Sequence, residues 1–195
     1  MTTAIIFIWL RENKIANAAN MAVAHAGVED VIVYTEHCDL NYTAAVNWNR
    51  AIDRVKHLAD NICIMGDDCY CQPGWLFNAL EAMKQLDDGW GMVNLNDGTG
   101  KDRTSHVVFD KRCLDLLDGK LLHEGYFFCC SDVEMQERMI AEDRWIFAPN
   151  ALAIHHHPMI LAGVPSDEYY EMSYAPEQRQ KDRELLAKRR EANWP

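Results

Sequence analysis

The chain has 195 residues, and its 49% hydrophobic and 25% charged residues are typical of a globular protein that folds as one domain. A formal net charge of -11 argues against a protein that coats nucleic acid through a broad basic surface. The apolar run at residues 4–10 is too short to span a bilayer and lacks the flanks of a secretory signal. We therefore expect a cytoplasmic protein with no membrane span.

Alternating strands and helices are predicted for the first half of the chain. Apolar, β-branched runs indicate strands, and apolar residues at helical spacing indicate helices. In chain order we expect strand 3–10, helix 13–27, strand 30–36, helix 43–59, strand 61–65 and a helix that starts near Pro73. This alternation predicts a Rossmann-like α/β unit, a mainly parallel sheet flanked by helices on both faces.

The second half of the chain changes character and predicts a mixed sheet. The elements expected there are strand 89–95, strand 104–110, helix 111–117, helix 131–142, strand 144–149 and strand 151–158. From Pro176 onward, basic residues outnumber acidic ones, and the simplest interpretation is a solvent-exposed terminal helix. We therefore divide the chain into one domain, residues 1–163, and a C-terminal helical extension, residues 164–195.

Seven cysteines are present, an odd number that leaves at least one thiol unpaired and favours a reducing compartment. Zinc binding is the competing interpretation, because Cys69, Cys71 or the adjacent Cys129 and Cys130 could meet a histidine in the fold. No CxxC pair is present, and cysteine often serves as a small buried hydrophobic residue.

Two adjacent carboxylates, Asp67 and Asp68, directly follow the predicted strand 61–65. In open α/β sheets, ligands bind beyond the carboxyl ends of the strands. Two like charges repel each other there unless a cation lies between them and a ligand. Oxygen donors of this kind suit Mg²⁺ or Mn²⁺, which complete their shells with water and substrate phosphates. A plain polar turn before the next helix is the alternative.

The segment ICIMGDDCYCQPGWLFNALEAM, residues 62–83, resembles the metal-binding segment of GT-A nucleotide-sugar glycosyltransferases, especially the large inverting family that includes cellulose and chondroitin synthases. Members carry an aliphatic strand that ends in Asp-x-Asp, then a short loop and a Pro-containing helix start. This chain departs from the motif at Gly66, which stands where the first Asp is expected. The resemblance covers roughly residues 3–160. It implies a GT-A fold with Mn²⁺ or Mg²⁺ on Asp68, and a nucleotide-sugar contact from Asp67.

Further donor-binding residues follow from the same resemblance. Trp9 and Arg11 come after the first strand, where the base and ribose usually bind. Glu36 lies at the tip of the second strand, where the family places an acid near the nucleotide. Arg50 belongs to NYTAAVNWNRAIDRV, which resembles the family's helix that leads into the metal strand. The resemblance implies that all of these bind the nucleotide sugar.

The segment FCCSDVEMQERMIAEDRWIFAP, residues 128–149, is similar to the family's Glu-Asp segment, whose Asp is the catalytic base of inverting members. The match implies that Asp132 is the base, with Ser131 in place of the usual Glu. The residues themselves also predict a capping box, with Ser131 as the N-cap and Glu134 three residues on. The helix dipole at this position would favour the ionised form of Asp132.

The triplet His155, His156 and His157 closes the last predicted strand. On an extended strand, His155 and His157 point to one face and His156 to the other. In several GT-A families a histidine at the end of this strand binds the metal, and counting from Pro149 matches it to His155. The resemblance therefore implies His155 as a metal ligand, and we expect His157, on the same face, to bind the metal as well. A polar strand end or an accidental metal site is the alternative.

The implied reaction moves a sugar from a nucleoside diphosphate to an acceptor hydroxyl, on a glycan or on a modified base in phage DNA, in a bacterial or phage-infected host cell. An inverting enzyme, a hexosyl- or pentosyltransferase, is expected, although the residues also allow retention. A nucleotidyltransferase is one alternative, but WLRENKIAN lacks the glycines of a phosphate loop. A non-catalytic Cys/His metal-binding module is the other. The oligomeric state is not indicated.

Overall fold

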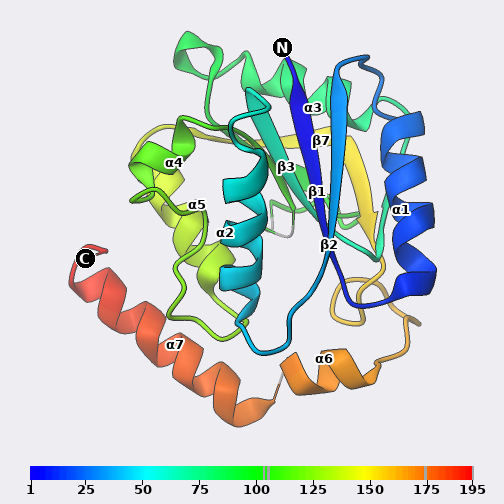
Figure 1. Cartoon of the computed structure of the whole chain (residues 1–195). Helices are drawn as coiled ribbons and strands as arrows, with labels where there is room; N and C mark the ends of the chain where they lie inside the picture. The colour runs from blue at the N-terminus through cyan, green and yellow to red at the C-terminus, as the bar shows by residue number, and fades with distance from the viewer. Residues whose placement is uncertain (103, 105, 174, 195) are drawn as a thin grey trace.

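The computed structural model describes residues 1–102, 104, 106–173 and 175–194, in which one sheet has helices on both faces (Figure 1). The strands are β1 (Thr3–Trp9), β2 (Val31–His37), β3 (Asn61–Gly66), β4 (Cys69–Cys71), β5 (Met92–Asn96), β6 (Val107–Asp110) and β7 (Trp145–His155). The helices are α1 (Glu12–Ala24), α2 (Ala44–Val55), α3 (Trp75–Met83), the 3-10 helix η1 (Asp87–Gly89), α4 (Cys113–Leu116), α5 (Ser131–Ala141), α6 (Glu168–Ser173) and α7 (Pro176–Glu191). None of the helices in these residues combines the length and the apolar composition of a bilayer-spanning segment.

The strand order in the described residues is β2-β1-β3-β6-β5-β7-β4. The pairs β1–β2, β1–β3 and β5–β7 are parallel, whereas β6 is antiparallel to β3 and β5, and β4 is antiparallel to β7. Most strands therefore run in one direction, and β4 and β6 run against them. This confirms the predicted mixed, mainly parallel sheet of a single α/β domain. Ser105, inside the predicted strand 104–110, and Tyr174 and Pro195, in the predicted extension, lie outside the described residues.

Two hydrophobic cores cover the two faces of the sheet, and β1 shows why the sequence folds in this way. Ile5 and Phe7 point into the core beneath α1 and α3, whereas Ala4 and Ile6 point into the core beneath α2, α4 and α5. All of these side chains are fully buried. A strand covered on both faces reads as a continuous apolar run because successive side chains alternate between the faces.

The end of the sheet differs from the prediction in one respect, because β7 is one strand where two were expected. Its pairing with β5 shifts between Leu95, opposite Ala148, and Asn96, opposite Leu152. Pro149 falls into this irregularity, where its missing N–H costs no ladder hydrogen bond. The strands therefore pass through the proline instead of stopping at it. The short β4 was also not predicted, and α6 falls within residues 164–195, the predicted helical extension.

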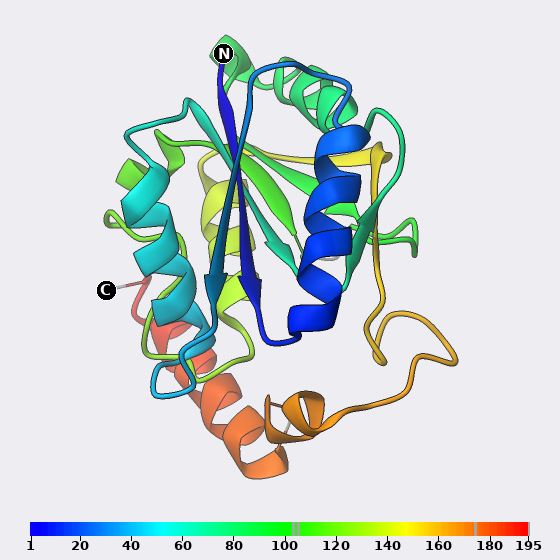
Figure 2. The ribbon, with the colours of Figure 1, turned by 45° about the vertical axis from the view of Figure 1, so that its right-hand side comes forward.

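The carboxyl ends of the parallel strands carry the site. In Figure 2, α6 and α7 cross below the end of the sheet toward which β1 and β2 point. The terminal helix is only partly the exposed helix that the sequence predicts, because Asp182 and Arg189 on α7 are buried. Arg189 pairs with Glu134 on α5, which fixes α7 to the domain. The division at residues 163 and 164 stays a prediction.

Candidate active site

A pocket of about 570 Å³ lies at the carboxyl ends of the parallel strands. Parallel α/β sheets bind their ligands at this end, because the loops that leave the strands converge there. The predicted residues that line the pocket are Arg11, Asp67, Asp68, Asp132, His155 and His157. Segments from both halves of the chain thus meet in one cavity.

Asp67 holds the tip of β1 against the tip of β3. Its Oδ2 accepts hydrogen bonds from the backbone N–H groups of Leu10, at 2.9 Å, and Arg11, at 2.7 Å. The Arg11 guanidinium donates to Oδ1 at 2.7 Å and, through Nε, to Asp167 at 2.7 Å. Asp67 is buried, so these bonds offset the cost of keeping its charge out of water. Its carboxylate is therefore already committed to protein groups.

Asp68 faces the pocket from the turn between β3 and β4. Its Oδ1 lies 3.3 Å from His155 Nε2, and the His156 N–H donates to its backbone oxygen at 2.9 Å. Burial opposes ionisation, but the hydrogen bond from His155 and the positive charges nearby outweigh it and hold the pKa of this carboxyl below its usual value. Asp68 is therefore an anion that can bind a cation.

The histidine triplet keeps its predicted alternation although β7 ends at His155. The His155 and His157 rings lie 5.0 Å apart between centroids, whereas the His156 ring packs on Tyr70 at 4.4 Å. Burial and the charge of His155 lower the pKa of His157 to about 4. His157 is therefore neutral at pH 7, which is the form of imidazole that binds metals.

These donors fit the divalent ion that the sequence predicts. Asp68 supplies a carboxylate, and His155 and His157 supply imidazoles on the same side of the strand end. The buried Nδ1 of His155 has no hydrogen-bond partner among the described residues. At Gly66 a Cβ would come within 2.8 Å of Asp68 Oδ1, so only glycine leaves the carboxylate this room. A carboxylate with imidazoles suits Mn²⁺ better than Mg²⁺, which prefers oxygen ligands.

Asp132 lines the same pocket from the first turn of α5. The predicted capping box is wrong: Ser131 is the first residue of the helix, and the N-cap is Cys130 at φ 73° without a side-chain cap. Glu134 instead accepts hydrogen bonds from Tyr126 and Arg189. The backbone N–H groups at the helix start favour the anion of Asp132, as expected, but burial outweighs them and raises its pKa.

The loop before Asp132 is held by the terminal helix. The buried Asp182 carboxylate accepts three backbone N–H groups, from Phe127 at 2.9 Å, Phe128 at 3.0 Å and Cys129 at 2.8 Å. The next residue, Cys130, has the left-handed φ that L-residues rarely adopt. Such a conformation persists where the surroundings fix it. Asp182 therefore positions the start of α5, and with it Asp132.

Three of the predicted donor-binding residues lie outside the pocket lining. The Trp9 ring packs edge-on against His37 at 4.6 Å. Glu36 forms an ion pair with Arg54 and accepts a hydrogen bond from Tyr34 at 2.9 Å. The Arg50 guanidinium stacks over Tyr42 at 4.7 Å. Their nucleotide-sugar roles stay predictions.

Some pocket residues were not predicted as site residues. Arg179 and Arg183 of α7 reach the cavity, and Thr104 and His106 enter it just before β6. His106 lies inside the predicted strand 104–110, but β6 begins at Val107, so His106 directly precedes the strand. It reaches the carboxyl end of β3 only because β6 is antiparallel to it. The sequence signalled only a single histidine at the start of an apolar run.

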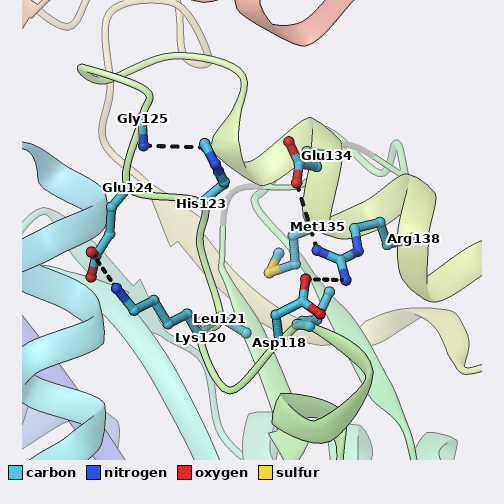
Figure 3. Close-up of a pocket in the computed structure, with 10 residues that line it drawn as sticks. Asp118, Lys120, Leu121, His123, Glu124, Gly125, Glu134, Met135 and Arg138 are labelled. Carbon is cyan, nitrogen blue, oxygen red and sulfur yellow. Dashed lines mark hydrogen bonds and ion pairs between the residues drawn. The ribbon is translucent and has the colours of Figure 1, made fainter. Parts of the chain in front are cut away.

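A second, smaller cavity of about 230 Å³ lies between α5 and the loop around Lys120 (Figure 3). Its charged groups are paired with one another. Arg138 bridges Glu134 at 3.7 Å and Asp118 at 2.9 Å, and Lys120 pairs with Glu124. The pairing leaves little charge for a ligand, so we place the site in the larger pocket.

Comparison with solved structures finds the same fold in glycosyltransferases. The catalytic domain of Drosophila β1,4-galactosyltransferase 7 in complex with xylobiose has a TM-score of 0.62 at 12% identity, covering 94% of this chain and 80% of that one. A mutant of that enzyme in complex with manganese, UDP-Gal and xylobiose has a TM-score of 0.57 at 11% identity, over 89% and 79%. Residues 1–349 of S. aureus TarS have a TM-score of 0.60 at 8% identity, over 80% of this chain and 61% of that one.

The sequence alone gives no comparable match. No protein-family model and no curated protein matches it. At these sequence identities the structural similarity establishes the fold and nothing further. The chain has the GT-A fold of nucleotide-sugar glycosyltransferases, as its sequence predicts.

Proposed function

We propose that this protein is a divalent-metal-dependent glycosyltransferase that moves a sugar from a nucleoside diphosphate to an acceptor hydroxyl. The observation that carries the proposal is that one pocket of about 570 Å³ is lined both by the pair Asp68 and His155, at the strand ends, and by Asp132, at the start of α5. The strand ends thus offer cation ligands, and the start of α5 offers a carboxylate that can take a proton.

The residues divide the reaction between these two parts of the pocket lining. Asp68, His155 and His157 would hold Mn²⁺, which supplies neutralisation of the charge that builds up on the diphosphate leaving group. Asp132 would accept the proton of the acceptor hydroxyl while the glycosidic bond forms and the bond to the diphosphate breaks. Its raised pKa favours this role, because a base takes up a proton more readily when its pKa lies nearer the working pH. Inversion at the anomeric carbon is the expected outcome.

The structural neighbours support a UDP-sugar donor and a carbohydrate acceptor. One neighbour structure contains UDP-Gal with manganese and xylobiose, and another contains UDP. The net charge of -11 weighs against a DNA acceptor. We therefore propose a glycan hydroxyl as the acceptor, and a modified base in phage DNA as the alternative that an acceptor screen would separate.

Metal-dependent donor binding tests the proposal. Titration calorimetry with UDP, with and without Mn²⁺, should show binding that requires the ion in the parent protein and is lost in Asp68→Asn. Asp97→Asn is the matched control, because Asp97 is also buried at this edge of the sheet but its carboxylate binds Thr99 and does not line the pocket. If Asp68→Asn binds UDP with unchanged metal dependence and melts normally, Asp68 is not the metal ligand.

A further inference from the structure

Three groups with metal-binding atoms converge beside Asp68. In the described part of the chain, Cys69, His106 and His155 place one donor atom each within 4.8 Å of the others. The Cys69 thiol lies 2.7 Å from His106 Nε2, and the His106 and His155 rings lie 4.6 Å apart between centroids. Cys69 and His106 are both buried. This is a thiol with two imidazoles, a donor set that suits zinc.

Gly66 sits where this cluster and Asp68 approach one another. A Cβ built on Gly66 would lie 3.6 Å from His106 Cε1, 3.9 Å from Cys69 Sγ and 2.8 Å from Asp68 Oδ1. The three side chains therefore surround the same glycine. Asp68 Oδ1 is also 3.3 Å from His155 Nε2, so its carboxylate adjoins the cluster and can serve as a fourth ligand.

We propose that Cys69, His106 and His155 bind a zinc ion, with the carboxylate of Asp68 or a water molecule as the fourth ligand. This site goes beyond the proposed function, which uses a harder ion on Asp68 and the histidines of the strand end. On binding, the Cys69 thiol loses its proton to solvent and the thiolate bonds to zinc, with no change of oxidation state. The ion takes the place of the thiol proton, and sulfur and nitrogen separate by about 1 Å to reach tetrahedral ligand distances.

His155 belongs to both ligand sets, and so does Asp68 where its carboxylate is the fourth zinc ligand, so the two ions compete for these side chains. Zinc held by Cys69 and His106 takes His155 from the Mn²⁺ site. Zinc should therefore inhibit the Mn²⁺-dependent reaction, and it should do so through a thiol that the reaction itself does not use. This consequence rests on the proposed function, whereas zinc binding does not.

Cobalt spectroscopy on the metal-free full-length protein tests the site directly. Co²⁺ bound to a thiolate absorbs in the near ultraviolet through sulfur-to-metal charge transfer, and added zinc bleaches the band as it displaces the cobalt. The parent protein should bind one equivalent with this band. Cys69→Ala should lose the band and weaken zinc binding by about 100-fold, and His106→Asn by at least about tenfold.

Cys71→Ala is the matched control, because Cys71 is a buried thiol on the same short strand, and its sulfur lies against Met65. It should keep the band and the zinc affinity. A parent protein without the band overturns the proposal, as does a band that survives in Cys69→Ala. If Cys69→Ala does not fold, His106→Asn decides the matter: unchanged zinc affinity in that variant removes the site.

Activity gives a separate readout. Hydrolysis of a UDP-sugar with Mn²⁺ should be inhibited by zinc in the parent protein and resist zinc in Cys69→Ala. If the protein shows the cobalt band but no activity toward nucleotide sugars, the zinc site is supported and the proposed function is wrong. If the protein is active but shows no band, the proposed function is supported and the zinc site is wrong.

Discussion

The two walls of the pocket are built in different ways. The strand wall, Asp68 with His106, His155 and His157, consists of side chains at strand ends that contact one another. The helix wall, Cys130 to Val133 at the start of α5, is held through its backbone by Asp182 on a different helix. The first wall is fixed locally by the sheet, and the second depends on a segment about fifty residues further along the chain.

The difference has a physical meaning for charge. On the strand wall, hydrogen bonds and positive charges hold the pKa of Asp68 below its usual value in spite of burial. On the helix wall, burial raises the pKa of Asp132, and no ion pair among the described residues offsets it. The pKa values of two carboxylates in one cavity are thus shifted in opposite directions. Carboxylates whose pKa values differ in this way can take different acid–base roles in one site.

Among substitutions that test this difference between the walls, the largest loss of turnover is expected on the helix wall. Asp132→Asn should lower turnover by about 10²–10⁴-fold, because an amide cannot take the proton from the hydroxyl of the sugar acceptor. Donor affinity and the melting temperature should barely change. Glu137→Gln, on the same helix but paired with Arg190 at the surface, is the control. Turnover close to that of the parent would exclude Asp132 as the base, and the anomeric configuration of the product should be read in the same assay.

The strand wall is tested by its histidines. His155→Ala should weaken Mn²⁺ binding by about 10–100-fold. His156→Ala should leave it nearly unchanged, because the His156 ring lies on Tyr70 and does not line the pocket. Metal titration of both variants gives the ranking. A larger loss for His156→Ala would mean that the metal assignment is wrong.

The dependence of the helix wall on α7 is tested by Asp182→Asn. The amide keeps one oxygen acceptor for three backbone N–H groups, so we expect a loss of about 2 kcal/mol in unfolding free energy. Turnover should fall while UDP affinity is kept, because the loop that positions Asp132 shifts. Glu184→Gln, exposed on the same helix and bonded to Gln180, is the control. Lost stability with unchanged turnover would show that Asp182 supports the fold without positioning the base.

The last expected effect is a pH dependence of stability that comes from the strand wall. Burial and the charge of His155 lower the pKa of His106 from 6.5 to about 3, with Asp68 opposing them and His157 adding to them. Between these values the unfolded chain binds a proton that the folded chain does not, so stability falls as the pH falls. The slope is up to about 1.4 kcal/mol per pH unit. Urea unfolding across pH 3–7 should show a shallower slope in His106→Gln, and the exposed His57→Gln should match the parent.

The sequence by itself determined the parts of this protein that depend on local pattern. Continuous apolar runs predicted β1 and β3, helical spacing predicted α2, and Asp67 and Asp68 after β3 placed a polar site at the carboxyl ends of the strands. The alternation of His155, His156 and His157 was predicted from strand geometry. The sequence predicts these features because the spacing of apolar residues and the order of the elements can be seen in neighbouring residues.

Only the tertiary structure decided which residues form each wall of the pocket. Asp67 and Asp68 look alike in sequence, but Asp67 is bonded to Arg11 and the backbone of Leu10, and only Asp68 is left to face His155. His106 and Asp182 reach the site through an antiparallel strand and a docked terminal helix, which no local pattern encodes. Burial, and with it the opposite pKa shifts of Asp68 and Asp132, arises only when distant segments exclude water together.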